Sequence, residues 1–263
     1  SHQGKSAFEG GFALDDSAIF RIYSMTKPIT SVAIMQLYEK SVIKLTDPIT
    51  KFIPAFKDVK VFDKGTPKDY TVREPERMIN IHDLLTHQAG LTYDFLLEHP
   101  VDALYRNEKI NGARSEKLNT AELCAKLAEM PLLFSPGTAW NYSVATDVLG
   151  HIVELASGKT LDAYFKDHIL DPLGMVDTFF HIPDDKRDRL MHNYSYDPLK
   201  RETKLAEQLA EIQAERQRIE SAASVERARR GEALEAMQAG LAPALTLTLT
   251  LTPFPRRSSP SPY

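Results

Sequence analysis

The sequence predicts an α+β fold in which helices are the main elements, followed by a helical C-terminal tail. A run of mainly apolar residues at 18–23 has the character of a strand and meets a helical pattern that starts near Ser24. Further helical patterns occupy 145–157 and 161–170. No aromatic residue occurs from position 197 to 253, so the core-forming part of the chain is expected to end near residue 196.

The first helix has clear start signals. Ser24 belongs to the residue types that cap helix N-termini, and Pro28 is tolerated in a helix only in its first turn. The other expected elements follow in chain order: turns with a one-turn helix at 42–56, a charged surface loop with room for a strand at 57–78, a short helix at 79–91 ending near Gly90, helical structure at 94–130 broken near Asn111, a turn at Pro136-Gly137, and a strand at 175–181.

Composition divides the chain into three parts. Residues 1–198 are expected to form one domain, with 43% hydrophobic residues in the whole chain to supply its core. Residues 199–240 are rich in Ala, Glu, Arg and Gln and show a narrow apolar stripe, which predicts a charged amphipathic helix that is either solvated or self-associated as a short coiled coil. Residues 241–263 contain a Leu-Thr repeat and a Pro/Ser-rich end, and form a low-complexity tail.

Charge and residue usage argue against several functions. The net charge of −4 gives no basic excess for nucleic acid, and no run of 18 apolar residues predicts a membrane span. Cys124, the single cysteine, is expected to pack in a helix. His82 and His87 are five residues apart, which is not the spacing of a helical metal pair, so neither a metal nor a cofactor is expected. The compartment stays open, with the cytoplasm favoured.

Ser24-Met-Thr-Lys27 is the pattern that carries chemistry. Residues three apart lie on one face of a helical turn, so Lys27 is placed beside the Ser24 hydroxyl. A serine hydroxyl becomes a nucleophile when a base removes its proton, and a lysine with a lowered pKa is such a base. Ser41-Val-Ile-Lys44 has the same spacing but follows the helix, so it is interpreted as a surface serine and lysine.

Four segments together resemble the serine β-lactamase-related family, which includes class C β-lactamases, DD-peptidases and family VIII carboxylesterases. The resemblance covers about residues 10–196 and rests on these segments in this order: Ser24-Met-Thr-Lys27, Leu84-Leu-Thr-His-Gln-Ala-Gly-Leu91, Phe134-Ser-Pro-Gly-Thr-Ala-Trp-Asn-Tyr-Ser143 and Asp171-Pro-Leu-Gly-Met175. It implies a β-lactamase/transpeptidase-like fold, with a helical region beside an antiparallel sheet that is incomplete here.

The resemblance also implies roles for three residues. Ser24 would be the acylated nucleophile, Lys27 its base partner, and Tyr142 the second acid/base. Tyr105-Arg-Asn107 matches a Tyr-x-Asn motif more literally than Tyr142 does, but Tyr142 follows Pro-Gly and precedes a helix, as the family motif does. Tyr142 is therefore the preferred residue.

Two departures from the family pattern affect the expected substrate. Val144 stands where class C enzymes have an amide side chain that holds the β-lactam, which favours esters. The third family motif, Lys/His-Thr-Gly or a Trp-Gly-Gly-like sequence, is missing after residue 200, where only Gly231 and Gly240 are glycines. The resemblance implies that this motif supplies an oxyanion donor, whose loss costs about 10²–10³ in rate.

These observations favour a serine hydrolase that cleaves small acyl esters through an acyl-enzyme on Ser24. One alternative is a β-lactamase or DD-peptidase acting on amides. Another is an inactive member that acts as an interaction protein through the 199–240 helix. If Lys27 is the base, its pKa must lie below the usual value, because an ammonium group has no lone pair to accept the serine proton.

Overall fold

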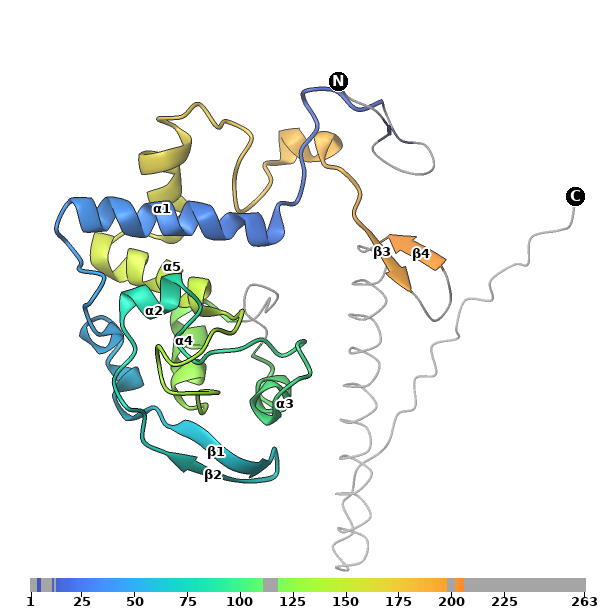
Figure 1. Ribbon diagram of the computed structural model, residues 1–263. Coiled ribbons are helices and arrows are strands. Elements are labelled where there is room, and N and C mark those ends of the chain that lie inside the picture. The colour runs from blue at the N-terminus through green and yellow to red at the C-terminus, as the bar shows by residue number, and fades with distance from the viewer. Residues whose placement is uncertain (1–3, 6–10, 12, 111–117, 198–201, 206–263) are drawn as a thin grey trace, which may run out of the picture. The chain divides into compact units, whose positions relative to one another are not determined.

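The computed structural model describes residues 4–5, 11, 13–110, 118–197 and 202–205. Two compact units are present, residues 1–191 and 192–263. The first unit is mainly helical (Figure 1). Its helices are α1 (Thr26–Glu39), α2 (Ile81–Leu85), α3 (Pro100–Asn107), α4 (Thr120–Ala128), α5 (Ala145–Ser157) and α6 (Leu161–Phe165). Shorter helical segments are Tyr23–Met25, Ile49–Lys51, Pro54–Asp58, Asp184–Arg189 and the π-helical turn Lys166–Leu170.

A two-stranded antiparallel sheet lies at one side of this unit. Strand β1 (Val61–Thr66) pairs with β2 (Asp69–Arg73), and the register shifts between Phe62 and Lys64, which marks a β-bulge (Figure 1). The segment predicted as a charged loop with room for a strand is thus a hairpin. A helical region beside a small antiparallel sheet confirms the predicted fold class.

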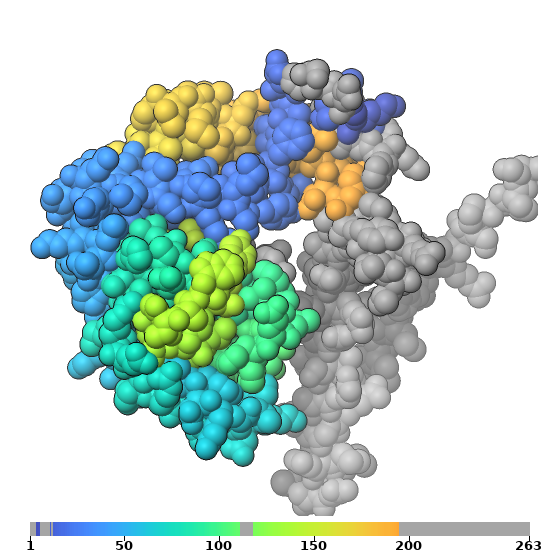
Figure 2. All heavy atoms as spheres, in the orientation of Figure 1, coloured from blue at the N-terminus to red at the C-terminus, as the bar shows by residue number. Residues whose placement is uncertain are grey.

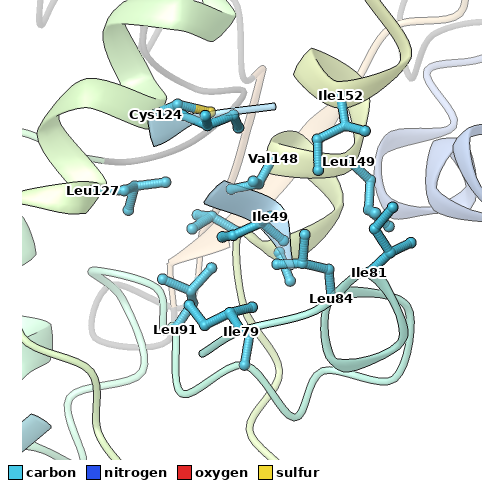
Figure 3. Close-up of a cluster of buried hydrophobic side chains, with 14 of the residues drawn as sticks. Ile49, Ile79, Ile81, Leu84, Leu91, Cys124, Leu127, Val148, Leu149 and Ile152 are labelled. Atoms are coloured by element: carbon cyan, nitrogen blue, oxygen red, sulfur yellow. The ribbon is translucent and has the colours of Figure 1, made fainter. Parts of the chain in front are cut away.

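Helix α5 lies at the centre of the hydrophobic core. It packs against α1, α2, α4 and α6. Val148, Leu149 and Ile152 are fully buried, and Figure 3 shows them in one cluster with Ile81 and Leu84 of α2. Each such side chain contributes about 1.5–3 kcal/mol when it is fully buried. Because α1 and α5 are packed together in this core, the residues at their N-terminal ends are held in fixed relative positions.

The predicted boundaries of the central helices are largely confirmed. Helix α5 spans 145–157 and ends at Gly158, whose φ of 70° is the left-handed cap that favours glycine. The predicted helix at 161–170 is α6 continued by the π-helical turn. Helix α2 is shorter than predicted. It starts with a capping box between Asn80 and Asp83 and ends at Leu85.

Two predicted strands are wrong. In the segment 18–23, Ile19 alone forms a β-bridge, with Leu190, while Phe20 is exposed. A strand needs a ladder of partners, and among the described residues this segment pairs only with Leu190. At 175–181 the backbone contains a turn instead, in which the amide of Thr178 donates to the carbonyl of Met175 at 3.2 Å.

The outer face of α1 is open. Val32, Met35 and Tyr38 are between 38% and 47% exposed. Figure 2 shows the blue atoms of α1 at the surface of the unit.

Within the described ranges, every helix is too short or too polar to cross a bilayer. The described residues also contain no group of three His, Cys, Asp or Glu side chains arranged to hold a metal ion.

The second unit contains one antiparallel hairpin among its described residues, formed by β3 (Tyr194–Asp197) and β4 (Glu202–Leu205). Strand β4 occupies positions that the sequence assigns to the start of the tail helix, so the helix predicted from residue 199 does not begin there. The rest of that predicted helix, 206–240, and the tail 241–263 lie outside the described residues.

Candidate active site

Ser24 lies immediately before α1, in the short 3₁₀ turn Tyr23–Met25. The N-cap residue of α1 is Met25, and no side chain caps the helix, so the predicted capping role of Ser24 is wrong. Tyr23 has a φ of 43°, a conformation that non-glycine residues rarely adopt. Ser24 is exposed, and its hydroxyl contacts two side chains and does not cap the backbone amides of α1.

Lys27 is the first of these partners. Its Nζ donates a hydrogen bond to the Ser24 Oγ at 3.3 Å, which agrees with the three-residue spacing. The same Nζ lies 4.8 Å from the centre of the Tyr142 ring and 5.6 Å from the centre of the Tyr93 ring. The ammonium group is therefore held between one hydroxyl and two aromatic rings.

Tyr142 is the second partner. Its hydroxyl lies 2.7 Å from the Ser24 Oγ, across 118 positions in the sequence. The loop that carries it is fixed by backbone hydrogen bonds, because the amide of Gly137 donates to Gln88 and the amide of Asn141 donates to His87. Gly137 has a φ of 83°, as the predicted Pro-Gly turn requires. The structure thus brings together the three residues singled out in the sequence.

His87 packs against the Tyr142 ring and contacts the next residue, Ser143. Its Nδ1 accepts a hydrogen bond from the amide of Ser143 at 3.3 Å and lies 3.2 Å from the Ser143 hydroxyl. The centre of its ring is 5.0 Å from the centre of the Tyr142 ring. Burial, together with the charge of Lys27, lowers the pKa of His87, which favours the neutral imidazole that this acceptor role needs.

The charges at the site differ from those expected. Burial alone would lower the pKa of Lys27, but hydrogen bonding to Tyr142 and Tyr93 outweighs burial, and the pKa lies above its usual value. The expectation of a lowered lysine pKa is therefore wrong. Burial tends to raise the pKa of Tyr142, yet hydrogen bonding with Lys27 and Ser24 leaves it lowered. Of the two groups, the phenol is the one whose deprotonation the site assists.

A cavity of about 460 Å³ opens beside Ser24. Its wall includes α1, the start of α5 and the start of α6. The residues that line it are Tyr23, Ser24, Thr26, Lys27, Thr30, Tyr93, Phe95, Tyr142, Thr146, Asp147, Leu161 and Phe180.

Sequence reasoning missed most residues of this wall, including Tyr93 and Asp147, which affect the charges of the site. Burial and the Asp147 carboxylate raise the pKa of Tyr93, and the same carboxylate acts in the raising direction on Tyr142. Tyr93 follows the Leu84–Leu91 segment, and Asp147 is the acidic residue in the first turn of α5. An acidic residue is common in a first helical turn, so this position did not by itself indicate a residue of the site.

Several other candidates fall outside the cavity. Tyr105 is fully buried on α3, and Ser41 is an exposed residue that follows α1. Val144 is also fully buried in the core, so its side chain does not face a substrate as expected. Cys124 packs in α4 as predicted, and burial raises the pKa of its thiol to about 12.

The chain is similar to several known proteins. The Beta-lactamase family matches residues 1–252. Esterase EstB from Burkholderia gladioli is 35% identical over 178 residues, which cover 68% of this chain and 42% of EstB. Acyltransferase calJ from Penicillium decumbens is 33% identical, with coverage of 66% and 40%. The structure of EstCE1, a hydrolase with promiscuous acyltransferase activity, has a TM-score of 0.64 at 29% identity and covers 77% of this chain and 49% of its own.

The chain spans a little less than half the length of the curated relatives it matches. The family match nevertheless extends over most of the 263 residues. The same fold is found in solved structures of penicillin-binding protein homologues, including one from Pyrococcus abyssi with a TM-score of 0.57 at 24% identity. The sequence match and the fold agree: this chain belongs to the beta-lactamase family.

Proposed function

We propose that this chain is a serine hydrolase that cleaves small, uncharged acyl esters through a covalent intermediate on Ser24. The observation that carries the proposal is the contact between Tyr142 and Ser24, whose oxygens are 2.7 Å apart, with the Lys27 ammonium 3.3 Å from the same serine oxygen. The names of its relatives, which include an esterase and acyltransferases, support this reaction class.

The proposed reaction uses Tyr142 as the base. Ser24 Oγ attacks the ester carbonyl carbon while its proton moves to the Tyr142 phenolate oxygen. The bond to the alcohol oxygen then breaks, and Tyr142 returns the proton to the departing alcohol. Water then attacks the acyl carbon of the acyl-enzyme while Tyr142 takes a proton from that water. The bond between the acyl carbon and the Ser24 oxygen breaks, and Tyr142 returns the proton to the serine oxygen. Lys27 remains an ammonium ion and stabilises the phenolate.

An uncharged ester fits the cavity better than a β-lactam does. A β-lactam carries a carboxylate, and among the described lining residues Lys27 is the only cation, already held by Ser24 and the two tyrosines. Asp147 in the same wall adds a negative charge that disfavours a second carboxylate. Faster hydrolysis of nitrocefin than of p-nitrophenyl butyrate would favour the β-lactamase alternative instead.

Labelling identifies the nucleophile. The full chain is expected to react with a fluorophosphonate probe and to hydrolyse p-nitrophenyl butyrate, and Ser24→Ala is expected to lose both properties. Ser41→Ala is the matched control, because Ser41-Val-Ile-Lys44 has the same spacing on an exposed segment. Labelling that survives Ser24→Ala, or that is lost in Ser41→Ala, would contradict the assignment.

Acyl transfer to an alcohol is a second candidate, favoured by the relatives named as acyltransferases. The same acyl-enzyme would form, with an alcohol replacing water in the second step. Adding 1-butanol during turnover of p-nitrophenyl butyrate and measuring butyl butyrate against butyric acid distinguishes the two reactions. An inactive chain that self-associates through 199–240 would show no Ser24-dependent labelling and would sediment as an oligomer.

A further inference from the structure

The cavity beside Ser24 has an open end and a buried end. Along α1, Ser24 is exposed, Lys27 is half-buried, and Thr30 is only 3% exposed. Thr26 and Thr30 are four residues apart, so about 6 Å of helix separates them. The cavity therefore deepens from the serine toward the interior of the unit.

We assign three lining side chains from three helices to the buried end: Thr30 of α1, Thr146 of α5 and Leu161 of α6. Thr30 and Thr146 are buried, and Leu161 contacts α5 at Gly150, one helical turn after Thr146. Thr30 donates its hydroxyl to the carbonyl of Thr26 at 3.3 Å, so this polar group is engaged within its own helix. Thr146 is 8% exposed, and Leu161 is half-buried against the core. Leu161 is the only leucine among these three residues, and the other two are threonines, so it supplies the largest apolar surface.

The position of Leu161 is fixed from two directions. Its backbone amide donates to the Glu154 carboxylate at 3.1 Å, which ties the start of α6 to α5. Its side chain rests on α5 at Gly150, where an added Cβ would lie 2.9 Å from a Leu161 methyl carbon. The absence of a side chain at Gly150 therefore determines how far Leu161 withdraws from the cavity.

We propose that Leu161, seated on Gly150, closes an acyl pocket and limits this enzyme to short, uncharged acyl groups. The inference rests on the proposed function. The acyl group stays bonded to Ser24 until water attacks, which suits the buried end of the cavity. The alcohol must leave, which suits the open end, where Tyr23 and Phe95 are 63% and 46% exposed.

The test compares kcat/KM for p-nitrophenyl butyrate, hexanoate and octanoate in the full chain. Leu161→Ala is expected to raise the hexanoate-to-butyrate ratio about tenfold, because added methylenes then find apolar space. Gly150→Ala is expected to lower that ratio by pushing Leu161 into the cavity. This variant should fold, because alanine favours a helix over glycine and the clash involves the flexible end of a side chain.

The double variant Leu161→Ala/Gly150→Ala should show the same raised hexanoate-to-butyrate ratio as Leu161→Ala, because the alanine at 161 leaves room for the new Cβ at 150. Leu155→Ala is the matched control, because Leu155 is a 48% exposed leucine of α5 outside the cavity lining. Its ratio should equal that of the wild type.

The outcomes separate this inference from the function on which it rests. Ser24-dependent turnover with an unchanged acyl profile in Leu161→Ala would overturn the inference alone. Turnover that does not depend on Ser24 would overturn both. A series of butyrate esters with ethyl, butyl and hexyl alcohols measures the preference for the alcohol part of the substrate. If Leu161→Ala changes this alcohol preference and leaves the acyl preference unchanged, the pocket is not an acyl pocket.

Discussion

Replacing Tyr142 with phenylalanine removes a single oxygen from the centre of the site. That oxygen lies 2.7 Å from the Ser24 Oγ, whereas the ring keeps its neighbours, His87 at 5.0 Å and Tyr93 at 5.3 Å between ring centres. The packing of the loop should therefore be retained. A positioned proton-transfer group contributes about 10²–10⁴ in rate. At 1.36 kcal/mol for each factor of ten, this corresponds to about 2.7–5.4 kcal/mol of activation free energy.

The assay is the pH dependence of kcat/KM for p-nitrophenyl butyrate. In the wild type, activity is expected to rise with pH as Tyr142 loses its proton, at a pKa below the usual 10.0 of tyrosine. Tyr142→Phe should be about 10³-fold slower, and the rising limb should disappear. Tyr105→Phe, which alters a fully buried tyrosine outside the cavity, serves as control. A Tyr142→Phe enzyme with wild-type rate and pH profile would refute the assignment of Tyr142 as base.

Three further predictions concern charge. In kcat/KM, Lys27→Arg should lose about tenfold and Lys27→Ala about 10³-fold. The reason is that the raised pKa makes Lys27 a permanent cation, and arginine retains this charge. Equal losses in the two variants would indicate that Lys27 is the base. Asp147→Asn removes a carboxylate that raises the pKa of Tyr142, so the rising limb of the pH profile should move to lower pH, and a shift to higher pH would contradict this. Arg77→Ala should lower the free energy of unfolding in urea by about 2–3 kcal/mol, because it removes two hydrogen bonds, of 2.6 and 2.7 Å, from the buried Asp83 carboxylate; a loss no larger than that of an exposed ion pair would show that the contact is unimportant.

The parts of the fold that the sequence predicted best depend on local pattern. Helix α5 combines buried apolar positions at helical spacing with Gly158 at its end, and its bounds are those predicted. The contact between Ser24 and Lys27 follows from a three-residue spacing that any helical turn satisfies. These features need no information from distant segments, so one sequence is sufficient to find them.

The parts that failed depend on partners elsewhere in the chain. The segment 18–23 has strand character, but a strand forms only where a second segment supplies a ladder, and Leu190 supplies a single bridge. Val144 occupies the position expected for a pocket residue, yet the helix start at Ala145 places it in the core. Tyr93 and Asp147 reach the site because the loop after α2 and the first turn of α5 meet there, which no local pattern reveals.

Lys27 and Tyr142 show the same limit of sequence-based prediction, here for the question of which group holds a proton. Spacing placed an amine near a serine but did not indicate which group would hold the proton. In the structure, one pair of contacts shifts both groups: hydrogen bonding to Tyr142 helps raise the pKa of Lys27, and hydrogen bonding to Lys27 helps lower the pKa of Tyr142. Two such groups titrate as a coupled pair, and the favoured ionised form is ammonium with phenolate. Removing either partner therefore changes the protonation of the other, so Lys27→Ala should also move the rising limb of the pH profile to higher pH.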